Sequence, residues 1–207
     1  MNLIFKNLIR IINDYKFSVF FIIFFEILFF IKGYKGFKIN FSKQDSMTDN
    51  IPCPYYFLFR INKTIKELSF LNFIDLGCGS GRVIEFFNKN FSNKHLIGLE
   101  SHESQYEYCS KIFENNNNIK IIQSDFTTTN LLQYDAVCFF LGAPFNKDSD
   151  FIKFMKNLTA LSFNKKILLI IVNYNKKIIE EFKNIKFIET YYISNNKGYS
   201  ICCLDNN

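Results

Sequence analysis

A glycine-rich run, Phe73-Ile-Asp-Leu-Gly-Cys-Gly-Ser-Gly-Arg82, is the part of the sequence whose residue types and spacing best suit ligand chemistry. Gly77, Gly79 and Gly81 let the backbone turn sharply and approach a ligand closely, because they carry no side chain. A helix that begins directly after them offers free amide N–H groups and the positive end of its dipole. A tight turn that binds no ligand is the simpler alternative. The run therefore indicates a ligand site only together with the residues around it.

Three acidic residues accompany this run, each near the end of a predicted strand. Asp75 lies two residues before the first glycine, where a carboxylate suits a cationic amino group. Glu100 follows Gly81 by 19 residues, where an acid can accept both hydrogen bonds of a ribose diol. Asp125 and Phe126 suit an adenine amino group and stacking on its ring. The alternatives are a neighbour of a helix N-cap for Glu100 and a solvent-exposed turn for Asp125.

The glycine spacing distinguishes two kinds of nucleotide-binding loop. A dinucleotide-binding loop reads G-x-G-x-x-G, whereas this run reads G-x-G-x-G with Asp75 two residues ahead. The spacing favours S-adenosylmethionine (SAM) over NAD as the ligand. Asp75 would then bind the methionine ammonium, directly or through water, and the backbone of residues 77–79 would hold the methionine and ribose.

A fourth apolar segment, residues 134–141, runs into Gly142-Ala-Pro-Phe145, where the methyl acceptor should lie. Methyl transfer is an in-line displacement, so positioning supplies much of the rate and a base is needed only for a protonated acceptor. His95 opens a strand and His102 begins a helix, so neither is a convincing base and the catalytic residue stays unassigned. The substrate-pocket candidates are Leu141, Ala143, Pro144, Phe145 and Asn173.

Strand and helix patterns alternate after residue 55, which is typical of a doubly wound sheet. The pattern predicts strands near 71–76, 95–99, 119–122, 135–141, 167–172, 185–192 and 199–204, and helices near 55–68, 81–91, 102–116, 148–162 and 175–183. The link between the last two strands, residues 194–198, is too short for a parallel crossover. We therefore predict an α/β fold with a seven-stranded doubly wound (Rossmann-like) sheet, an antiparallel last strand and an N-terminal helical apolar arm.

From about residue 51 to 204 the chain resembles the class I SAM-dependent methyltransferases, and Asp75–Gly81 (DLGCGSG) is the most specific element of the resemblance. Residues 52–55, 140–145 and 172–175 look like the P-T-P-Y, L-Y-N-P-F and Y-N-N segments of a bacterial group within that class. Ala143 replaces that group's asparagine, which separates the chain from amino-methylating N-P-P-F enzymes. The similarity implies that Tyr55 or Tyr56 helps to cover the bound cofactor. The candidate SAM site therefore comprises Asp75, Gly77, Cys78, Gly79, Gly81, Glu100, Ser101, Asp125, Phe126 and Tyr55.

The N-terminal arm and linker, residues 1–50, precede a predicted methyltransferase domain at residues 51–207. Residues 3–15 have the apolar spacing of an amphipathic helix, and residues 17–31 are apolar except for Ser18 and Glu26. This run is shorter than the roughly 20 residues that span a bilayer, so it could cross with snorkelling lysines, lie in the interface, or pack on the domain. Lysines follow it, which is typical of a cytoplasmic flank. We expect the chain at the cytoplasmic face of the cell membrane, in contact with lipid through residues 1–38, with the cytoplasm as the alternative.

The charge distribution and the cysteine content limit the kinds of partner that we expect, namely nucleic acid and metal. Residues 1–66 carry 10 Lys and Arg against 4 Asp and Glu, whereas residues 67–207 carry 15 of each. A neutral domain argues against a nucleic-acid substrate, although an RNA methyltransferase that binds phosphate through its arm stays an alternative. Six scattered cysteines and two histidines give no zinc spacing, so we expect core thiols and no metal.

The sequence thus predicts a membrane-associated SAM-dependent methyltransferase with a membrane-local acceptor. A more distant likeness to membrane-associated protein lysine methyltransferases, which also pair an N-terminal apolar helix with this domain, implies a protein acceptor, with lysine as one candidate. A non-catalytic SAM-binding scaffold is a second alternative. An NAD-dependent oxidoreductase is disfavoured because the third glycine is misplaced.

Overall fold

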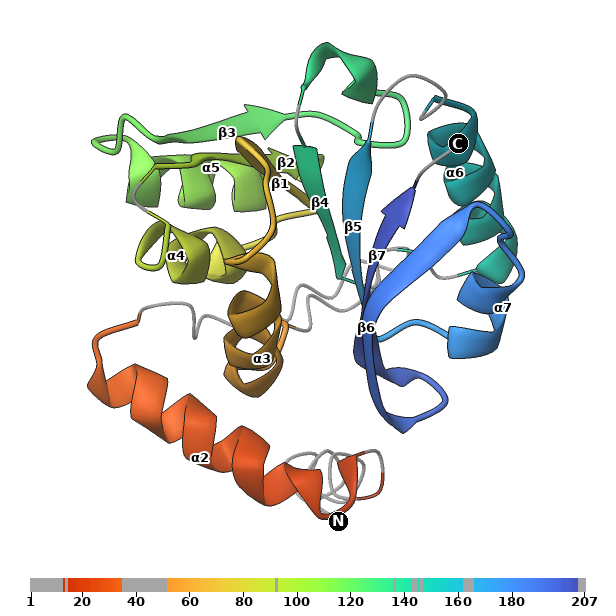
Figure 1. Ribbon diagram of the computed structural model, residues 1–207. Coiled ribbons are helices and arrows are strands. Elements are labelled where there is room, and N and C mark those ends of the chain that lie inside the picture. Colours follow the sequence, from red (N-terminus) through yellow and green to blue (C-terminus); the bar gives the residue numbers. More distant parts are fainter. Residues whose placement is uncertain are drawn as a thin grey trace.

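Seven strands form one mixed sheet in the order β3-β2-β1-β4-β5-β7-β6 (Figure 1). The computed structural model describes residues 13, 15–34, 52–91, 93–135, 137–142, 145, 147–161 and 166–204. The strands are β1 (Asn72–Leu76), β2 (His95–Glu100), β3 (Ile119–Gln123), β4 (Val137–Gly142), β5 (Ile167–Val172), β6 (Ile185–Ser194) and β7 (Lys197–Leu204). β7 is antiparallel to both of its neighbours, and β1 to β5 pair in parallel. The predicted fold class and the antiparallel last strand are confirmed.

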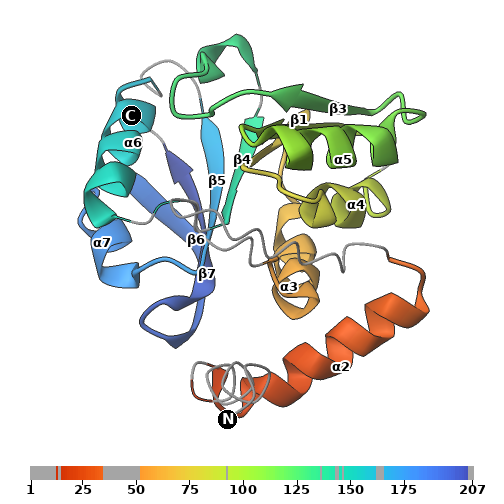
Figure 2. The same cartoon turned by 180° about the vertical axis from the view of Figure 1, so that it is seen from behind.

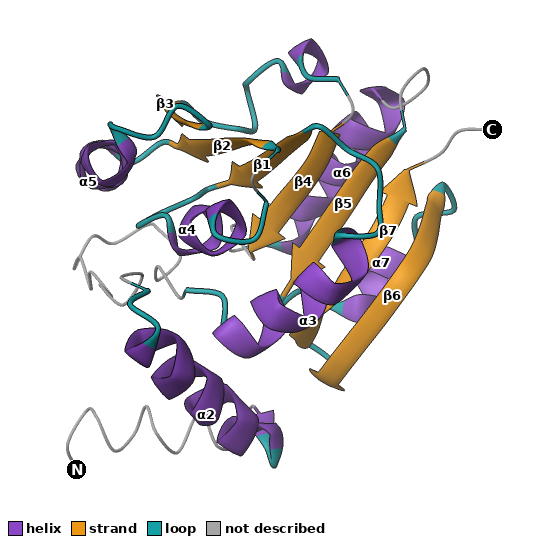
Figure 3. Ribbon diagram, turned by 60° about the vertical axis from the view of Figure 1, so that its left-hand side comes forward, coloured by secondary structure: helices purple, strands orange, loops and turns teal. Residues whose placement is uncertain are grey.

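Helices cover both faces of the sheet (Figures 2 and 3). The helices are α2 (Ser18–Ile31), α3 (Tyr55–Ile65), α4 (Arg82–Asn88), α5 (Glu103–Phe113), α6 (Asp148–Leu161) and α7 (Lys176–Glu180), with a 3₁₀ turn at Leu131–Gln133. One buried cluster joins α2, α3, α4 and α5 to side chains such as Phe73 and Phe140. A second joins α6 and α7 to Ile74 and Leu141. Because successive residues of β1 and β4 point to opposite faces and both faces are covered, these strands are apolar apart from Asn72 and Asp75 of β1.

The helix α2 packs on the domain through α3 and α4 (Figure 1). Val19, Ile22 and Phe29 are buried, and their spacing places them on one side of the helix. In Figures 1 and 3, α2 lies beyond α3 at the end of the molecule toward which β4 and β5 run. The predicted helix at residues 3–15 falls almost wholly outside the described residues.

No helix among the described residues combines the length and the apolar character that a membrane span requires. Of the three alternatives for residues 17–31, crossing of the bilayer finds no support, because α2 has 14 residues. The six cysteines are all buried and form no disulfide, which agrees with the prediction of core thiols.

Candidate active site

The glycine loop between β1 and α4 is held by backbone hydrogen bonds to β2. The amides of Gly77 and Cys78 both donate to the carbonyl of Leu99, at 2.9 Å. The φ angles of Gly77, Gly79 and Gly81 are 82°, 53° and 81°, in the left-handed region that only glycine adopts readily. The loop is therefore shaped by its glycines, as the sequence predicts.

Close packing of α5 adds a second reason for glycine at position 81. A Cβ atom there would lie 2.7 Å from the Sγ atom of Cys109 and from the Cε2 atom of Phe113. Gly98 on β2 similarly leaves room for Cys78, whose Sγ atom would lie 2.7 Å from a Cβ at position 98. The Cys78 thiol thus packs against the sheet, and only the backbone of this residue remains available to a ligand.

The Cys78 thiol is also a poor nucleophile. It lies 4.0 Å from the thiol of Cys109, and this contact together with burial raises the pKa of Cys78 well above its ordinary value. Because the thiolate is the nucleophilic form, a raised pKa disfavours reactivity. We assign Cys78 no covalent role.

Asp75 is a buried carboxylate at the end of β1, only 3 % exposed. Its Oδ2 atom has no hydrogen-bond partner among the described residues. Burial, and then the neighbouring charge of Glu100, raises the pKa of Asp75 well above its ordinary value. An orphaned buried carboxylate oxygen is costly unless a ligand supplies a donor. The position fits the cationic ammonium group of SAM.

Glu100, at the end of β2, ties the glycine loop to the start of α5. Its Oε2 atom accepts a hydrogen bond from the amide of Gly79 at 2.8 Å, and its Oε1 atom accepts one from the amide of His102 at 2.8 Å. A carboxylate has about four acceptor positions, so these two bonds leave capacity for a ribose diol. The second bond also matches the alternative of a residue beside a helix start, and ribose binding stays a prediction.

Asp125, after β3, is exposed and closes its own turn. Its Oδ1 atom accepts hydrogen bonds from the amide and the hydroxyl of Thr127, at 2.8 and 2.7 Å. Phe126 is half-buried and packs edge-on against Phe145 and Phe154, with ring centroids 5.6 and 5.4 Å apart. Ser101 is exposed directly after β2. Contacts of these residues with adenine or ribose stay predictions.

The substrate-pocket candidates occupy different environments. Leu141 is buried in the core, whereas Phe145 is half-buried beside Phe126. Asn173 has a φ angle of 56° and exchanges hydrogen bonds with Gly198, through which it joins the end of β5 to β7. Ala143 and Pro144 lie outside the described residues. The acceptor pocket is therefore defined only in part.

Tyr55, predicted to cover the cofactor, is fully buried beneath α2. Its ring stacks on Phe29 with centroids 4.8 Å apart, and the Arg82 guanidinium lies 4.5 Å from its ring centre. Its hydroxyl oxygen has no hydrogen-bond partner among the described residues. Tyr56, the other candidate, contacts the hydroxyl of Tyr191 at 3.2 Å.

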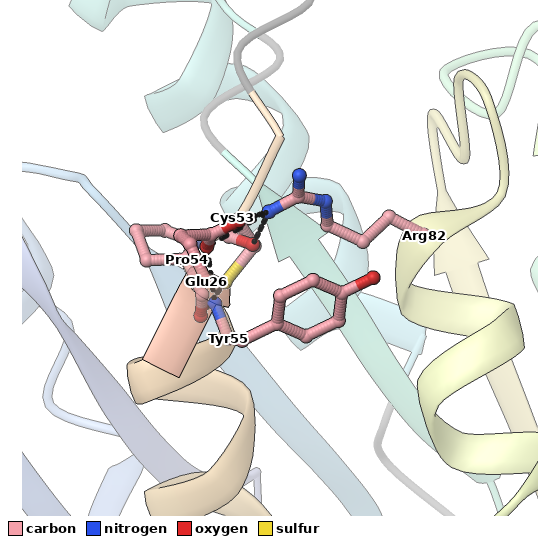
Figure 4. Close-up of polar contacts among 5 residues, drawn as sticks. All are labelled: Glu26, Cys53, Pro54, Tyr55 and Arg82. Atoms are coloured by element: carbon pink, nitrogen blue, oxygen red, sulfur yellow. Dashed lines mark hydrogen bonds and ion pairs between the residues drawn. The ribbon is translucent and has the colours of Figure 1, made fainter. Parts of the chain in front are cut away.

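Two charged residues that sequence reasoning did not single out as site residues meet beside the glycine loop. Glu26 of α2 forms an ion pair with Arg82, the first residue of α4, at 2.9 Å (Figure 4). The lone acid inside an apolar run, and an arginine directly after the glycines, were the available signals. Because 56 residues separate them in the sequence, no local pattern indicates their contact.

Residues 73–162 match the family model described as a methyltransferase domain. Among curated proteins no sequence match reaches significance.

Solved structures with the same fold include three of distant sequence. A SAM-dependent methyltransferase of Leishmania major is 16% identical, with a TM-score of 0.52 over 72% of this chain and 71% of that one. A human methyltransferase 10 domain containing protein is 12% identical, with a TM-score of 0.54 over 82% and 91%. Aeropyrum pernix fibrillarin, in complex with natively bound SAM, is 9% identical, with a TM-score of 0.50 over 63% and 65%.

The family match covers the glycine loop and the two strand ends that follow it, so the cofactor is SAM. The residues around the loop fit that cofactor, because the buried Asp75 Oδ2 atom has no donor among the described residues and the glycines leave the loop backbone accessible. With the matched methyltransferase domain, the strand order and the glycine loop together, this chain is a SAM-dependent methyltransferase.

Proposed function

We propose that this methyltransferase works at the cytoplasmic face of a membrane, with α2 lying in the lipid interface, and that it methylates a membrane-local acceptor, a protein side chain such as lysine. The observation that carries the proposal is the outer face of α2. Large apolar side chains of α2 and of its N-cap residue are 45 to 86 % exposed, namely Phe17, Phe20, Phe21, Ile23, Phe24, Ile27, Phe30 and Ile31.

The two sides of α2 are suited to different neighbours. Val19, Ile22 and Phe29 pack on the domain, whereas the exposed side chains form one continuous apolar face. Contiguous exposed apolar surface of this kind marks membrane or protein contact sites. Exposed lysines, Lys16 and Lys32, flank the helix and suit anionic lipid head groups.

The length of α2 favours lying in the interface over crossing. Fourteen residues extend about 21 Å at 1.5 Å per residue, which is less than the roughly 30 Å of a bilayer core. Because α2 also lies at the end toward which β4 and β5 run, a membrane under α2 would face the edge where the acceptor is expected (Figures 1 and 3).

The chemistry divides between the cofactor and the chain. SAM supplies an electrophilic methyl group on a positively charged sulfur. The chain binds and orients its partners through the buried carboxylates of Asp75 and Glu100 and the backbone of the glycine loop. Phe126 and Phe145 shape an apolar border near the acceptor edge.

Membrane binding is tested by co-sedimentation of the full chain with phosphatidylcholine vesicles, with and without phosphatidylglycerol. We expect the wild type to sediment with anionic vesicles and the triple variant Phe20→Ser, Phe24→Ser, Ile27→Ser to stay in solution. Leu71→Ser, which removes an apolar side chain 59 % exposed before β1, is the matched control. Equal sedimentation of the triple variant and the wild type would exclude α2 as the anchor.

Methyl transfer is tested with radiolabelled SAM and the membrane and soluble fractions of cells that lack the gene. We expect label in membrane protein, sensitive to protease, that disappears with Asp75→Ala. Label in lipid would replace the protein acceptor, and label lost to ribonuclease would favour the RNA alternative. Binding of SAM without label in either fraction would favour a non-catalytic scaffold.

A further inference from the structure

We propose that the carboxylate of Asp148, held in place by the hydroxyl of Tyr174, contacts the amino nitrogen that receives the methyl group and so makes the enzyme selective for an amine acceptor. The inference rests on the proposed function, in which the acceptor is a lysine side chain. It names the group of this chain that meets that side chain, whereas the cofactor site accounts only for the methyl donor.

The contact between Asp148 and Tyr174 spans the carboxyl edge of the sheet at β4 and β5. The last residues of these two strands, Gly142 and Val172, are partners in parallel register, so both strands end at the same level. Asp148 is the first residue of α6, which follows β4, and Tyr174 is the second residue after β5. The Tyr174 hydroxyl donates to the Asp148 Oδ1 atom at 3.1 Å and joins the two chain segments that follow these strands.

This edge lies close to the cofactor loop. β4 pairs with β1 on its other side, with Leu141 opposite Leu76, and the glycine loop begins at the next residue, Gly77. Neighbouring strands lie about 4.8 Å apart, so the end of β5 lies roughly 10 Å from the start of the loop. In open α/β sheets ligands bind beyond the carboxyl ends of the strands where the strand order reverses, which here is between β1 and β4. We therefore expect the acceptor to meet the cofactor beyond β4, with Tyr174 on the side opposite the loop.

Tyr174 fixes the position of the carboxylate. Its ring is buried and stacks on Phe151 of α6, with centroids 3.6 Å apart. Phe145 packs against Phe151 at 6.1 Å and connects this pair to the apolar border of the acceptor edge. Burial, and then the hydrogen bond to Asp148, raises the pKa of Tyr174, so the hydroxyl stays protonated and donates. Asp148 itself is exposed, which leaves its carboxylate accessible to an acceptor.

A carboxylate at this position suits an amine acceptor. The lone pair of a neutral amine forms the new N–C bond while the S–C bond breaks and the sulfur keeps that electron pair. Positive charge therefore passes from sulfur to nitrogen, and the products are a methylammonium group and S-adenosylhomocysteine (SAH), with the ammonium proton later lost to solvent. A fixed carboxylate beside the nitrogen stabilises the charge that develops there. A carboxylate acceptor would instead be repelled by Asp148.

The test measures the initial rate of methyl transfer from radiolabelled SAM, with the full chain and limiting amounts of membrane fraction from cells that lack the gene. We expect Asp148→Asn to lower the labelling rate of membrane protein about tenfold or more, and to bind SAH within about twofold of the wild type by calorimetry. The asparagine amide oxygen can still accept the Tyr174 hydrogen bond, so this substitution removes the charge and keeps the bridge. A purely structural role of the bridge predicts an unchanged rate, and that result would overturn the inference.

Two further variants separate the position of the carboxylate from its charge. Asp150→Asn removes another exposed carboxylate from the same first turn of α6 and should label like the wild type. Tyr174→Phe keeps the ring that stacks on Phe151 but releases the Asp148 carboxylate, so we expect a smaller loss of rate, about two- to fivefold. A loss for Asp150→Asn equal to that for Asp148→Asn would assign the effect to the general charge of α6 and overturn the inference.

Acetylation of the membrane fraction with acetic anhydride, which blocks lysine amines, distinguishes this inference from the proposed function. We expect acetylation to abolish the labelling of membrane protein. Labelling of membrane protein that survives acetylation agrees with a membrane-local acceptor but overturns the amine, and with it the role of Asp148. If no membrane component is labelled, the proposed function and this inference fail together.

Discussion

An acidic residue lies at or just after the end of each of the strands β1, β2 and β3, but the three carboxylates differ in burial. Asp75 and Glu100 are buried, whereas Asp125 is exposed and its carboxylate already closes a turn. A buried carboxylate is costly and needs a partner, whereas an exposed one is solvated whether or not a ligand binds. Asp75 therefore has a buried oxygen that a ligand would have to satisfy, Glu100 is buried but already bonded to two amides, and Asp125 needs no ligand.

Asp75→Asn should produce the largest loss. The substitution keeps the size of the side chain but removes the charge that faces the ammonium group, so we expect SAH binding to weaken about 100-fold, the upper range for a charge-assisted hydrogen bond. Calorimetry measures the binding, and thermal unfolding of the free variant checks that it is folded. An affinity within threefold of the wild type would remove Asp75 from the site.

The pH dependence of binding follows from the raised pKa of Asp75. The ammonium group needs the ionised carboxylate, so SAH affinity should fall as pH decreases through the raised pKa, about tenfold per pH unit below it. The stability of the free protein depends on pH in the opposite sense. Its free energy of unfolding falls as pH rises from the ordinary pKa of an aspartate to the raised pKa of Asp75, because the folded state binds the proton more tightly. Asp75→Asn should flatten the binding profile, and an unchanged slope would assign the titration to another group.

Glu100→Gln should have a smaller but clear effect. A glutamine can accept only one of the two amide hydrogen bonds from Gly79 and His102, and it loses acceptor capacity for the ribose diol. We expect SAH affinity to fall about tenfold. Glu103→Gln, on the exposed first turn of α5, is the control. If Glu100→Gln weakens the binding of 2′-deoxy SAH as much as the binding of SAH, then Glu100 supports the loop without touching the ribose.

Asp125→Asn should have the smallest effect. The amide oxygen of asparagine can keep the turn with Thr127, so only an interaction with the adenine amino group would be weakened. We expect a loss of about two- to fivefold for SAH, in the range of an exposed hydrogen bond. S-inosylhomocysteine, which lacks the amino group, should bind the variant no worse than the wild type. A large loss for both ligands would place Asp125 with the two buried acids.

The sequence alone determined the fold and the cofactor class. Local patterns carry this information, because apolar runs of strand length, the G-x-G-x-G spacing and the short link before β7 each act within a few residues. The positions of Asp75 and Glu100 at neighbouring strand ends follow from the parallel order of the same elements.

Only the tertiary structure decided which of the candidate residues are buried, which are satisfied and which face each other. Cys78 turns its thiol to the sheet, Asn173 joins β5 to β7, and Asp125 binds its own turn, because side-chain packing and not spacing sets these contacts. The pairing of Glu26 with Arg82 depends on how α2 docks on α3 and α4, a long-range contact with no local signature. The sequence therefore shows the arm only as an apolar run, whereas in the fold one side of α2 packs on α3 and α4 and its other side is exposed among the described residues.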